Sequence, residues 1–497
     1  MNDAPDETRR ERPTAAARPR RIAVVALISV LAGAALIAGS PTRPPAPAAA
    51  RATEAVMQPP AGVRSSAWFC PGGVPGADAP VSDNVYVTNL SARDTSVRLT
   101  ALSTTRPPVG RQVGVAANSM VAVSVADLSD APDAAVVVEP FSDGIVVEES
   151  IATPTRDDVA IGPCATASSP TWYFAAGSTA SGSEQWLSLL NPYATDAVVD
   201  ITLVTNEGQR RPDALRGVPV LARTRVAIHV NEHADRKQWV AVIVESREGA
   251  RVVAQQTVVH NDVGGRIGLS SALGAPAPAT RFTFATGSRR PGSARVLFLL
   301  NPGEVPTSVD VQLAAEGTTP TTISIPAESI EVINLNELVP AGTTYAVIVQ
   351  SAADFEQSGA STGEGGIVVE DWENFRIEDG PFSFFGVDGG IGGIDPSTEW
   401  RFARSRLNDE VKGYVMVYNP GESSAQVRVA FVSDGQSVEP DDAFIEVPGA
   451  SRGTLRIDSI VGSDAGLVVT SDRPVYVERF VVRGEAATRA AGIPTRP

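Results

Sequence analysis

Histidine is the side chain most often used for acid-base and metal chemistry near neutral pH, and this chain of 497 residues contains only three. His229 and His233 are four positions apart, a spacing that brings two zinc ligands together on one helix face. The surrounding residues indicate a strand that runs into a turn, where this geometry is not implied. We therefore expect His229, His233 and His260 to be ordinary surface or core residues, with a weak zinc or pH-sensing pair as the less favoured alternative.

Residues 359–363 match the G-x-S-x-G pattern that holds the nucleophile of many serine hydrolases. That mechanism needs a strand-turn-helix elbow and a later histidine as base, and no histidine follows His260. The Gly- and Ser-rich stretch 353–366 around the match indicates a flexible loop instead. Adjacent acids such as Asp157 and Asp158 lie in turn-like segments, whereas a glycosidase needs two carboxyls facing each other across a cleft. The sequence therefore predicts no catalytic residues, no metal site and no cofactor, and we expect no enzyme activity.

One segment, 371–396, mixes aromatic side chains with many glycines and is the candidate binding region. Aromatic rings on a Gly-rich connector can present a surface for a glycan or a protein. The favoured alternative is that they pack into the joint between neighbouring domains, since tandem domains need an interface. The side chains are Trp372, Phe375, Phe382, Phe384 and Phe385.

The elements that position these residues belong to a repeated unit. An asparagine ends an apolar strand at intervals of about 100 to 120 residues, and two further markers recur in the same order. One is an aromatic strand that opens three of the four units, the first unit offering only Trp68 and Phe69. The other is a pair of apolar residues followed by Glu or Gln near the end of each unit. Because solenoid repeats run about 20 to 50 residues, this period indicates whole sandwich domains in tandem. The asparagines are Asn89, Asn191, Asn301 and Asn419, and the later markers are Glu148, Gln255, Glu370 and Glu478.

Alternation of apolar and polar residues predicts seven short strands in the last unit, and helical signal is scarce. We therefore predict an all-β fold of four tandem immunoglobulin-like β-sandwich repeats of about 100 residues after one N-terminal transmembrane helix. The expected repeats cover residues 64–165, 166–278, 279–390 and 391–497. The expected strands of the last one cover residues 400–403, 414–419, 425–432, 444–447, 453–458, 466–471 and 475–482.

Residues 22–39 contain no charged side chain. As a helix rising 1.5 Å per residue they would cover about 27 Å, slightly short of a typical hydrocarbon core of ~30 Å, so the segment can just span a bilayer. The Arg-rich segment 1–21 should stay cytoplasmic by the positive-inside bias, which sends the rest outward. A cleaved signal peptide, which would release a secreted protein, is the alternative. Residues 40–63, rich in Pro and Ala, are expected to form a semi-rigid stalk.

Charge limits the possible partners, and the cysteine pair agrees with an extracytoplasmic location. A net charge of -16 repels nucleic acid, which we exclude as a partner. The two cysteines, Cys70 and Cys164, bracket the first repeat, so in an oxidising compartment they are expected to form a disulfide. A redox or metal role would need closer spacing or further ligands.

Three sequence motifs resemble β-sandwich repeats of bacterial surface proteins: the runs 172–179 and 189–192, and the closing segment 475–480. Over residues 64–497 the chain is similar to an actinobacterial family of secreted or membrane-anchored proteins, domain of unknown function 5719. The resemblance implies a fold and an envelope location but no catalytic residue. We expect a membrane-anchored extracytoplasmic scaffold or protein-interaction rod of the cell envelope, with envelope proteins or glycans as partners. The alternative is a carbohydrate-binding surface protein.

Overall fold

The computed structural model describes residues 67–74, 81–153, 158–263, 266–351, 365–379, 382–405, 412–460, 464–483 and 486–495. The predicted transmembrane segment 22–39, the stalk 40–63 and the hydrolase-like motif 359–363 lie outside these residues. Within the described part, no helix is long and apolar enough to cross a bilayer.

The described chain is all-β, as predicted, and its sheets are antiparallel except for one parallel contact between β25 and β33. The burial pattern explains why. In β20 (Thr307–Ala314), Val309, Val311 and Leu313 are buried while Asp310 and Gln312 are exposed, the period-two alternation of a strand with one face on a core. The only helical elements described are short 3₁₀ turns: η1 (Asp213–Leu215), η2 (Val230–Glu232), η3 (Arg247–Gly249) and η4 (Leu335–Glu337).

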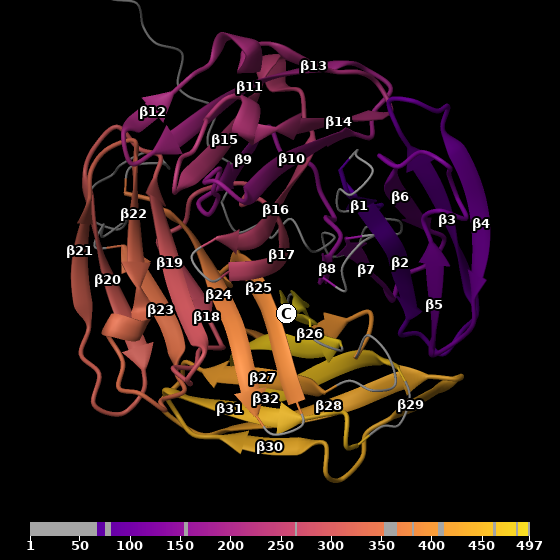
Figure 1. Cartoon of the computed structure of the whole chain (residues 1–497). Helices are drawn as coiled ribbons and strands as arrows, with labels where there is room; N and C mark the ends of the chain where they lie inside the picture. The colour runs from indigo at the N-terminus through magenta and orange to yellow at the C-terminus, as the bar shows by residue number, and fades with distance from the viewer. Residues whose placement is uncertain are drawn as a thin grey trace, which may run out of the picture. The chain divides into compact units, whose positions relative to one another are not determined.

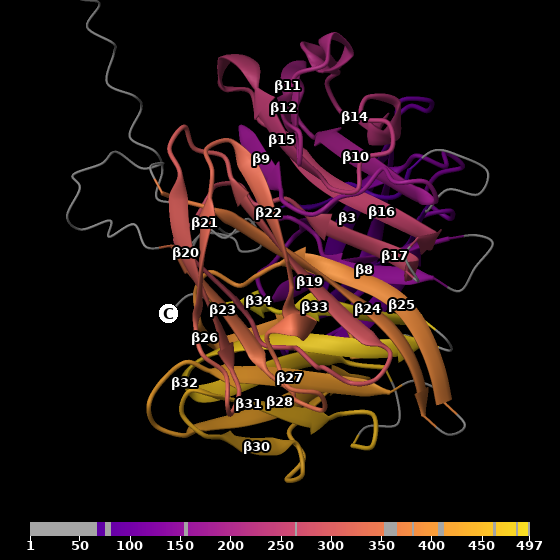
Figure 2. The same ribbon diagram turned by 60° about the vertical axis from the view of Figure 1, so that its left-hand side comes forward.

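The strands form four successive groups, which we call the first to fourth sheet pairs, and one 13-stranded sheet runs through both the third and the fourth (Figures 1 and 2). The first pair joins β1 (Trp68–Cys70), β6 (Ala135–Pro140), β3 (Thr95–Leu102) and β4 (Val109–Val115) in one sheet with β5 (Ser119–Ser124), β2 (Val81–Asn89), β7 (Ile145–Ala152) and β8 (Val159–Pro163) in the other. The second pair has β12 (Gly208–Arg210), β11 (Ala197–Thr205), β15 (Val240–Ser246), β9 (Thr171–Phe174) and β13 (Val218–Val220) in one sheet, and β14 (Thr224–His229), β10 (Ser183–Asn191), β16 (Val253–Val263) and β17 (Arg266–Leu273) in the other.

The third pair contains β18 (Arg281–Phe284), β23 (Ala346–Ser351), β20 and β21 (Thr321–Ile325) opposite β22 (Ser329–Asn334), β19 (Ser293–Asn301), β24 (Val368–Asp379) and β25 (Phe382–Ile391). The fourth contains β26 (Ser397–Phe402), β27 (Gly413–Asn419), β28 (Ala425–Ser433), β29 (Gln436–Val438), β30 (Phe444–Val447), β31 (Ser451–Arg456), β32 (Gly466–Arg483), β33 (Ala486–Ala491) and β34 (Ile493–Pro494). The last two strands predicted from sequence are merged in β32, and the predicted boundary between residues 390 and 391 falls inside β25.

Apolar cores fill the space between the two sheets of each pair. In the first pair, Val97 and Leu99 from one sheet pack with Val87 and Val147 from the other, and all four are fully buried. The cores also continue across the junctions. Ala403 and Ile493 of the fourth pair, for example, belong to the core of the first.

The inner strands β8, β17, β25 and β33 connect the pairs to one another. β17 contacts β25, β25 pairs with β33, and β33 contacts β8, so the fourth pair returns to the first. In Figure 1, β8, β17 and β25 lie at the inner side of their sheets. The expectation of a linear rod is therefore wrong for the described residues. The repeated sequence markers give only the order of the units along the chain, so the contacts between the ends of the units could not be predicted from them.

The predicted disulfide is confirmed: Cys70 and Cys164 are bonded, and both are fully buried. Cys70 ends β1, and Cys164 follows β8, where Phe69 and Ala165 also exchange backbone hydrogen bonds. The bond therefore fastens the first strand of the first sheet pair to the segment that leaves it.

Replacing both cysteines (Cys70→Ser with Cys164→Ser) should lower the free energy of unfolding by about 2–5 kcal/mol, because the crosslink closes a sequence separation of 94 residues. Urea denaturation of the oxidised protein and the double variant measures the difference. The variant should also be insensitive to reducing agent. Equal stability of the two proteins would show that the bond contributes nothing to the fold.

Candidate functional site

The four repeat asparagines are fully buried and have structural roles. In each, the side-chain amide donates to the backbone oxygen of the residue four positions later, at 2.7 Å for Asn89 and 2.8 Å for Asn191, Asn301 and Asn419. Each Oδ1 also accepts from the backbone N–H two positions later, at 3.0 Å. Each side chain thus satisfies the turn that follows its strand, and none is available to a ligand.

The repeat glutamates join neighbouring sheet pairs. Glu370 of the third pair accepts a hydrogen bond from the backbone N–H of Ala176 in the second pair, at 2.8 Å. Glu478 of the fourth pair accepts from the N–H groups of Ala285 and Thr286 in the third, both at 3.1 Å. Both donor segments follow the aromatic strand of their pair, where the chain leaves the sheet. The carboxyl group therefore accepts from backbone N–H groups that are not paired within a β-sheet.

The junction between the second and first pairs differs, and the sequence explains it. Pro71 stands at the position of Ala175 and Ala285 and has no N–H to offer a carboxylate. The second pair correspondingly carries Gln255 in place of Glu. Its Arg225, which is fully buried, instead donates to the backbone oxygens of Pro71 at 2.9 Å and Asp133 at 3.1 Å.

A buried ion pair joins the fourth sheet pair to the first. Arg479 in β32 donates to Glu148 in β7 at 2.9 Å, and both side chains are fully buried. Arg479 also donates to the backbone oxygen of Arg404, and Thr88 of the first pair donates to the backbone oxygen of Ala403. These contacts close the cycle of sheet pairs, and breaking such a buried pair by removing one partner costs about 3–5 kcal/mol.

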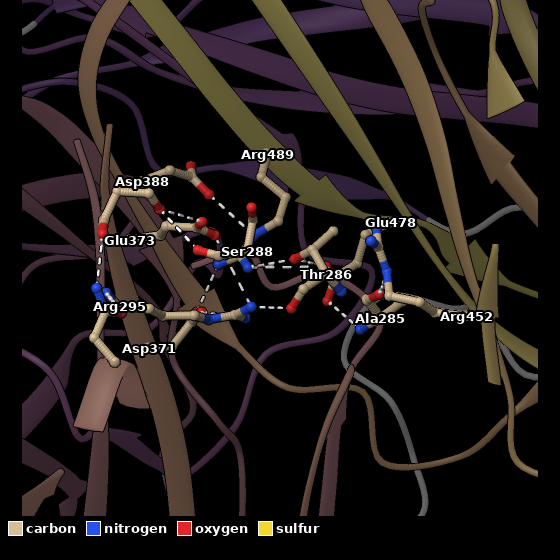
Figure 3. A network of polar contacts seen from close by, with 12 residues as sticks. Ala285, Thr286, Ser288, Arg295, Asp371, Glu373, Asp388, Arg452, Glu478 and Arg489 are labelled. Atoms are coloured by element: carbon tan, nitrogen blue, oxygen red, sulfur yellow. Dashed lines mark hydrogen bonds and ion pairs between the residues drawn. The ribbon is translucent and has the colours of Figure 1, made fainter. Parts of the chain in front are cut away.

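A larger network of buried charges lies where the third and fourth pairs meet (Figure 3). Asp371 binds two guanidinium groups, Arg295 Nε at 2.6 Å and Arg489 Nη2 at 2.6 Å. Arg489 also donates through Nε to Asp388 at 3.1 Å and through Nη1 to Thr286 Oγ1 at 2.7 Å. Figure 3 shows Arg489 and Thr286 between the Arg295 cluster on one side and Glu478 with Arg452 on the other.

Burial shifts the acids at these junctions toward the neutral form. Desolvation raises the pKa of Glu370 to about 8, although the backbone N–H groups of Ala176 and Ala175 oppose the shift. Desolvation likewise raises the pKa of Asp388 to about 7, against the charge of Arg489, and raises the pKa of Glu373. Glu370 and Asp388 can therefore change protonation near neutral pH.

The network borders a cavity of about 610 Å³. Its lining comes from all four sheet pairs and includes segments of β8, β17, β25 and β33, and the side chains of Glu478 and Arg489 form part of its wall. The lining is mostly apolar with a few polar groups, which is the composition of small-molecule sites.

The predicted aromatic surface is not on a connector loop. Trp372 and Phe375 lie in β24, 4% and 6% exposed, so they present no surface to a partner. Trp372 contacts Trp239 and His260 of the second pair and Phe298 of the third, with ring centroids 4.8 to 6.1 Å apart. These contacts agree with the favoured alternative, in which the aromatic side chains pack into the joint between neighbouring domains. Phe382, Phe384 and Phe385 lie in β25, and their side chains are outside the described part.

The three histidines lie in different surroundings. His229 stacks on Trp186 with ring centroids 4.1 Å apart, and His260 is buried against Trp372. His233 follows η2, after the turn that separates it from His229. Among the described residues, no group of three or more His, Cys, Asp or Glu side chains is arranged to hold a metal ion.

Glu370 and Glu478 are recognisable in the sequence as repeat markers, but their role in joining sheet pairs was not predicted, although a signal was present. In β24, Glu370, Asp371 and Glu373 follow two buried valines, so acids occupy consecutive positions on both faces of a strand. In an isolated sandwich one of those faces should be apolar. Acids on both faces indicate that the strand is covered on both sides by polar partners.

Part of the chain matches a known family model. Residues 150–266 and 250–353 match the model of a Family of unknown function (DUF5719), which confirms the resemblance over these residues. No curated protein is detectably similar to the chain.

Solved structures show only weak similarity. A tetra-tandem repeat from the extending region of a large adhesion protein is 14% identical, covers 82% of this chain and 94% of its own, and has a TM-score of 0.09. A DUF4785 family protein from Legionella pneumophila is 8% identical. The match covers 63% of this chain and 86% of that protein, and the TM-score is 0.11. The FN1–FN3 domains of chicken CNTN1 are 10% identical. The match covers 65% of this chain and 99% of theirs, and the TM-score is 0.10. Scores this low carry no argument about this protein, and the strand pairing itself defines the fold.

Replacing Glu370 with Gln should flatten the pH dependence of stability. The pKa of Glu370 is about 8 in the folded protein against 4.5 ordinarily, so between these values the folded state keeps a proton that the unfolded chain has lost. Wild-type stability should therefore fall as pH rises through this window, by up to about 1.4 kcal/mol per pH unit for this group. Urea denaturation from pH 5 to pH 8 measures the slope.

The glutamine is a suitable replacement because its oxygen can still accept from Ala176 N–H, and Gln255 occupies the equivalent position naturally. Asp310→Asn, in an exposed position of β20, is the matched control and should leave the slope unchanged. If E370Q shows the wild-type slope, burial does not control the protonation of Glu370.

Proposed function

We propose that this protein is a non-enzymatic scaffold of the bacterial cell envelope, anchored by residues 22–39 with its C-terminal region outside the membrane. The four sheet pairs then form a preassembled platform for envelope proteins. We infer that they derive from one immunoglobulin-like sandwich unit, repeated over residues 64–165, 166–278, 279–390 and 391–497. The identical contacts of the four buried asparagines support this origin.

The buried pair of Arg479 and Glu148 is the observation that carries the scaffold proposal. Because it joins the fourth sheet pair to the first, loops far apart in the sequence are held at fixed positions. Asn118 of the first pair, for example, accepts a backbone hydrogen bond from Gly435 of the fourth at 3.1 Å. A partner that contacts both loops would bind without the entropic cost of ordering them.

The extracytoplasmic location is supported by the disulfide between Cys70 and Cys164. Such bonds form and persist in oxidising compartments and are rare in the cytosol.

A structural role of the buried acids supports the non-enzymatic part of the proposal. The carboxyl groups at the junctions bind arginines and backbone N–H groups, and these contacts join neighbouring sheet pairs. Asp371, for example, is bound by two guanidinium groups and is fully buried.

Opening the cycle should remove partner binding while leaving the individual sandwiches folded. Arg479→Ala leaves Glu148 as an uncompensated buried charge, and we expect a loss of about 3–5 kcal/mol at this junction. Arg106→Ala, which breaks the exposed pair with Asp130, is the matched control and should behave as wild type. In-cell crosslinking followed by mass spectrometry compares the proteins captured by each full-length chain.

The scaffold proposal predicts proteins that wild type and R106A both capture and that R479A loses. Circular dichroism of R479A should retain the β-sheet spectrum. Capture of the same proteins by all three chains, or retention of wild type on purified cell-wall glycan alone, would contradict a protein scaffold.

A further inference from the structure

The cavity at the ends of the inner strands is large enough for a ligand. Its volume of about 610 Å³ lies within the range of about 300–1,000 Å³ that small-molecule sites occupy. Asp395 lines it and is exposed, so the cavity reaches solvent at that residue. A molecule can therefore enter it from outside.

The wall is built from equivalent residues of the four sheet pairs. The residue after each inner strand donates its backbone N–H to the backbone oxygen of the residue before the repeat Glu or Gln. These bonds run from Cys164 to Val147 at 3.1 Å, from Gly274 to Ala254 at 3.3 Å, from Gly392 to Val369 at 3.3 Å and from Gly492 to Val477 at 3.1 Å. The last residues of the four inner strands therefore share one position in the repeat, and all of them line the cavity: Pro163, Leu273, Ile391 and Ala491.

These four residues give the cavity an apolar surface. Each of them is only partly buried, so its side chain has area left to contact a ligand. The buried carboxyl of Glu478, by contrast, is already used by the backbone N–H groups of Ala285 and Thr286. A ligand in the cavity therefore meets aliphatic side chains from all four sheet pairs.

Small residues keep the space open, although packing does not require them there. The second-last residues of the inner strands are Gly162, Ala272, Gly390 and Ala490, and all four line the cavity. A Cβ built on Gly162 or Gly390 meets no atom within 4 Å, and neither residue has the positive φ that disfavours a side chain. Further along β17 the reason for a glycine is different, since a Cβ on Gly268 would lie 2.5 Å from the backbone nitrogen of Val387 in β25.

An unfilled space of this size is costly for a folded protein. Protein interiors contain few voids larger than a water molecule, and a cavity lowers stability roughly in proportion to its volume. A larger side chain at any of the four equivalent positions would reduce that cost. The units differ in sequence elsewhere, yet each has kept Gly or Ala at this position, which indicates that the space has an occupant.

The charges of the wall select an uncharged occupant. The guanidinium of Arg489 is already bound to Asp371, Asp388 and Thr286, so an anion would meet the carboxylates of Glu478 and Asp395 without gaining this cation as a partner. A cation is disfavoured as well, because burying its charge among aliphatic side chains costs free energy.

We propose that this cavity binds one compact, uncharged hydrocarbon-like molecule, which the aliphatic side chains at the ends of the inner strands hold by apolar contact. The driving force is the removal of apolar surface from water on both the ligand and the wall. The site is independent of the scaffold role, because it needs the inner surface of the closed cycle and not its outer loops.

Photolabelling with adamantyl diazirine tests the proposal. On irradiation this uncharged probe loses N₂, and the carbene that remains inserts into a nearby C–H bond. The full-length chain is held in lipid nanodiscs, and labelled residues are identified by mass spectrometry, so uptake of the probe by lipid does not obscure the result. Labelling should be saturable at Leu273 and Ile391.

Three competitors of the same shape separate the chemical classes: adamantane, adamantane-1-carboxylate and 1-adamantanamine. Adamantane should remove the label from Leu273 and Ile391. The anion and the cation should leave it in place at the same concentration. Non-saturable labelling of these residues, labelling confined to other parts of the chain, or equal competition by either ion would overturn the proposal.

Filling the cavity identifies the site. Gly390→Leu should abolish labelling of Leu273 and Ile391, and Gly162→Leu should do the same from another wall, which provides a second variant if circular dichroism shows that the first is unfolded. Gly114→Leu, on the exposed strand β4 where a Cβ also meets no atom within 4 Å, is the matched control and should label as wild type does. Wild-type labelling in the folded filled variant would contradict a ligand site in this cavity.

Discussion

The arrangement depends on the buried contact between the first and fourth sheet pairs. Arg479 and Glu148 are far apart in the sequence, yet each is fully buried against the other. Two charges removed from water are tolerated only when they meet each other, so this contact fixes how the last strands lie against the first. The central cavity exists because of that closure, since its lining comes from all four pairs. The fixed spacing of the outer loops has the same origin.

At each junction, unpaired backbone groups need hydrogen-bonding partners, and different residues provide them. The segment after the aromatic strand leaves its sheet with unpaired backbone groups, and the neighbouring pair satisfies them. Arg225 and Arg452, at equivalent positions of β14 and β31, donate to the oxygens of Pro71 and Ala285. Where Pro71 removes one of the two N–H groups, the glutamate is replaced by glutamine. Divergence between the units therefore follows the hydrogen-bonding needs of each partner segment.

Much of the local structure could be predicted from sequence. The alternating strands, the asparagine turns and the disulfide depend on residues close in the chain or on a single pair of cysteines. The closed cycle could not be predicted, because its contacts run from side chains such as Glu370 and Arg225 to backbone groups that leave no mark in the sequence. For the same reason Trp372 was open to two interpretations: an aromatic ring beside glycines is compatible with a surface or a joint, and only the burial of the ring distinguishes them.

Closure is tested most directly by the distance between the first and fourth sheet pairs. Spin labels at Ala116 and Gln436, two exposed positions beside the contact of Asn118 with Gly435, report this distance by double electron–electron resonance. The closed cycle predicts one short, narrow distance distribution, and R479A should broaden it. A long or broad distribution in the wild-type chain would show that the sheet pairs are strung out in a line, and would contradict the account.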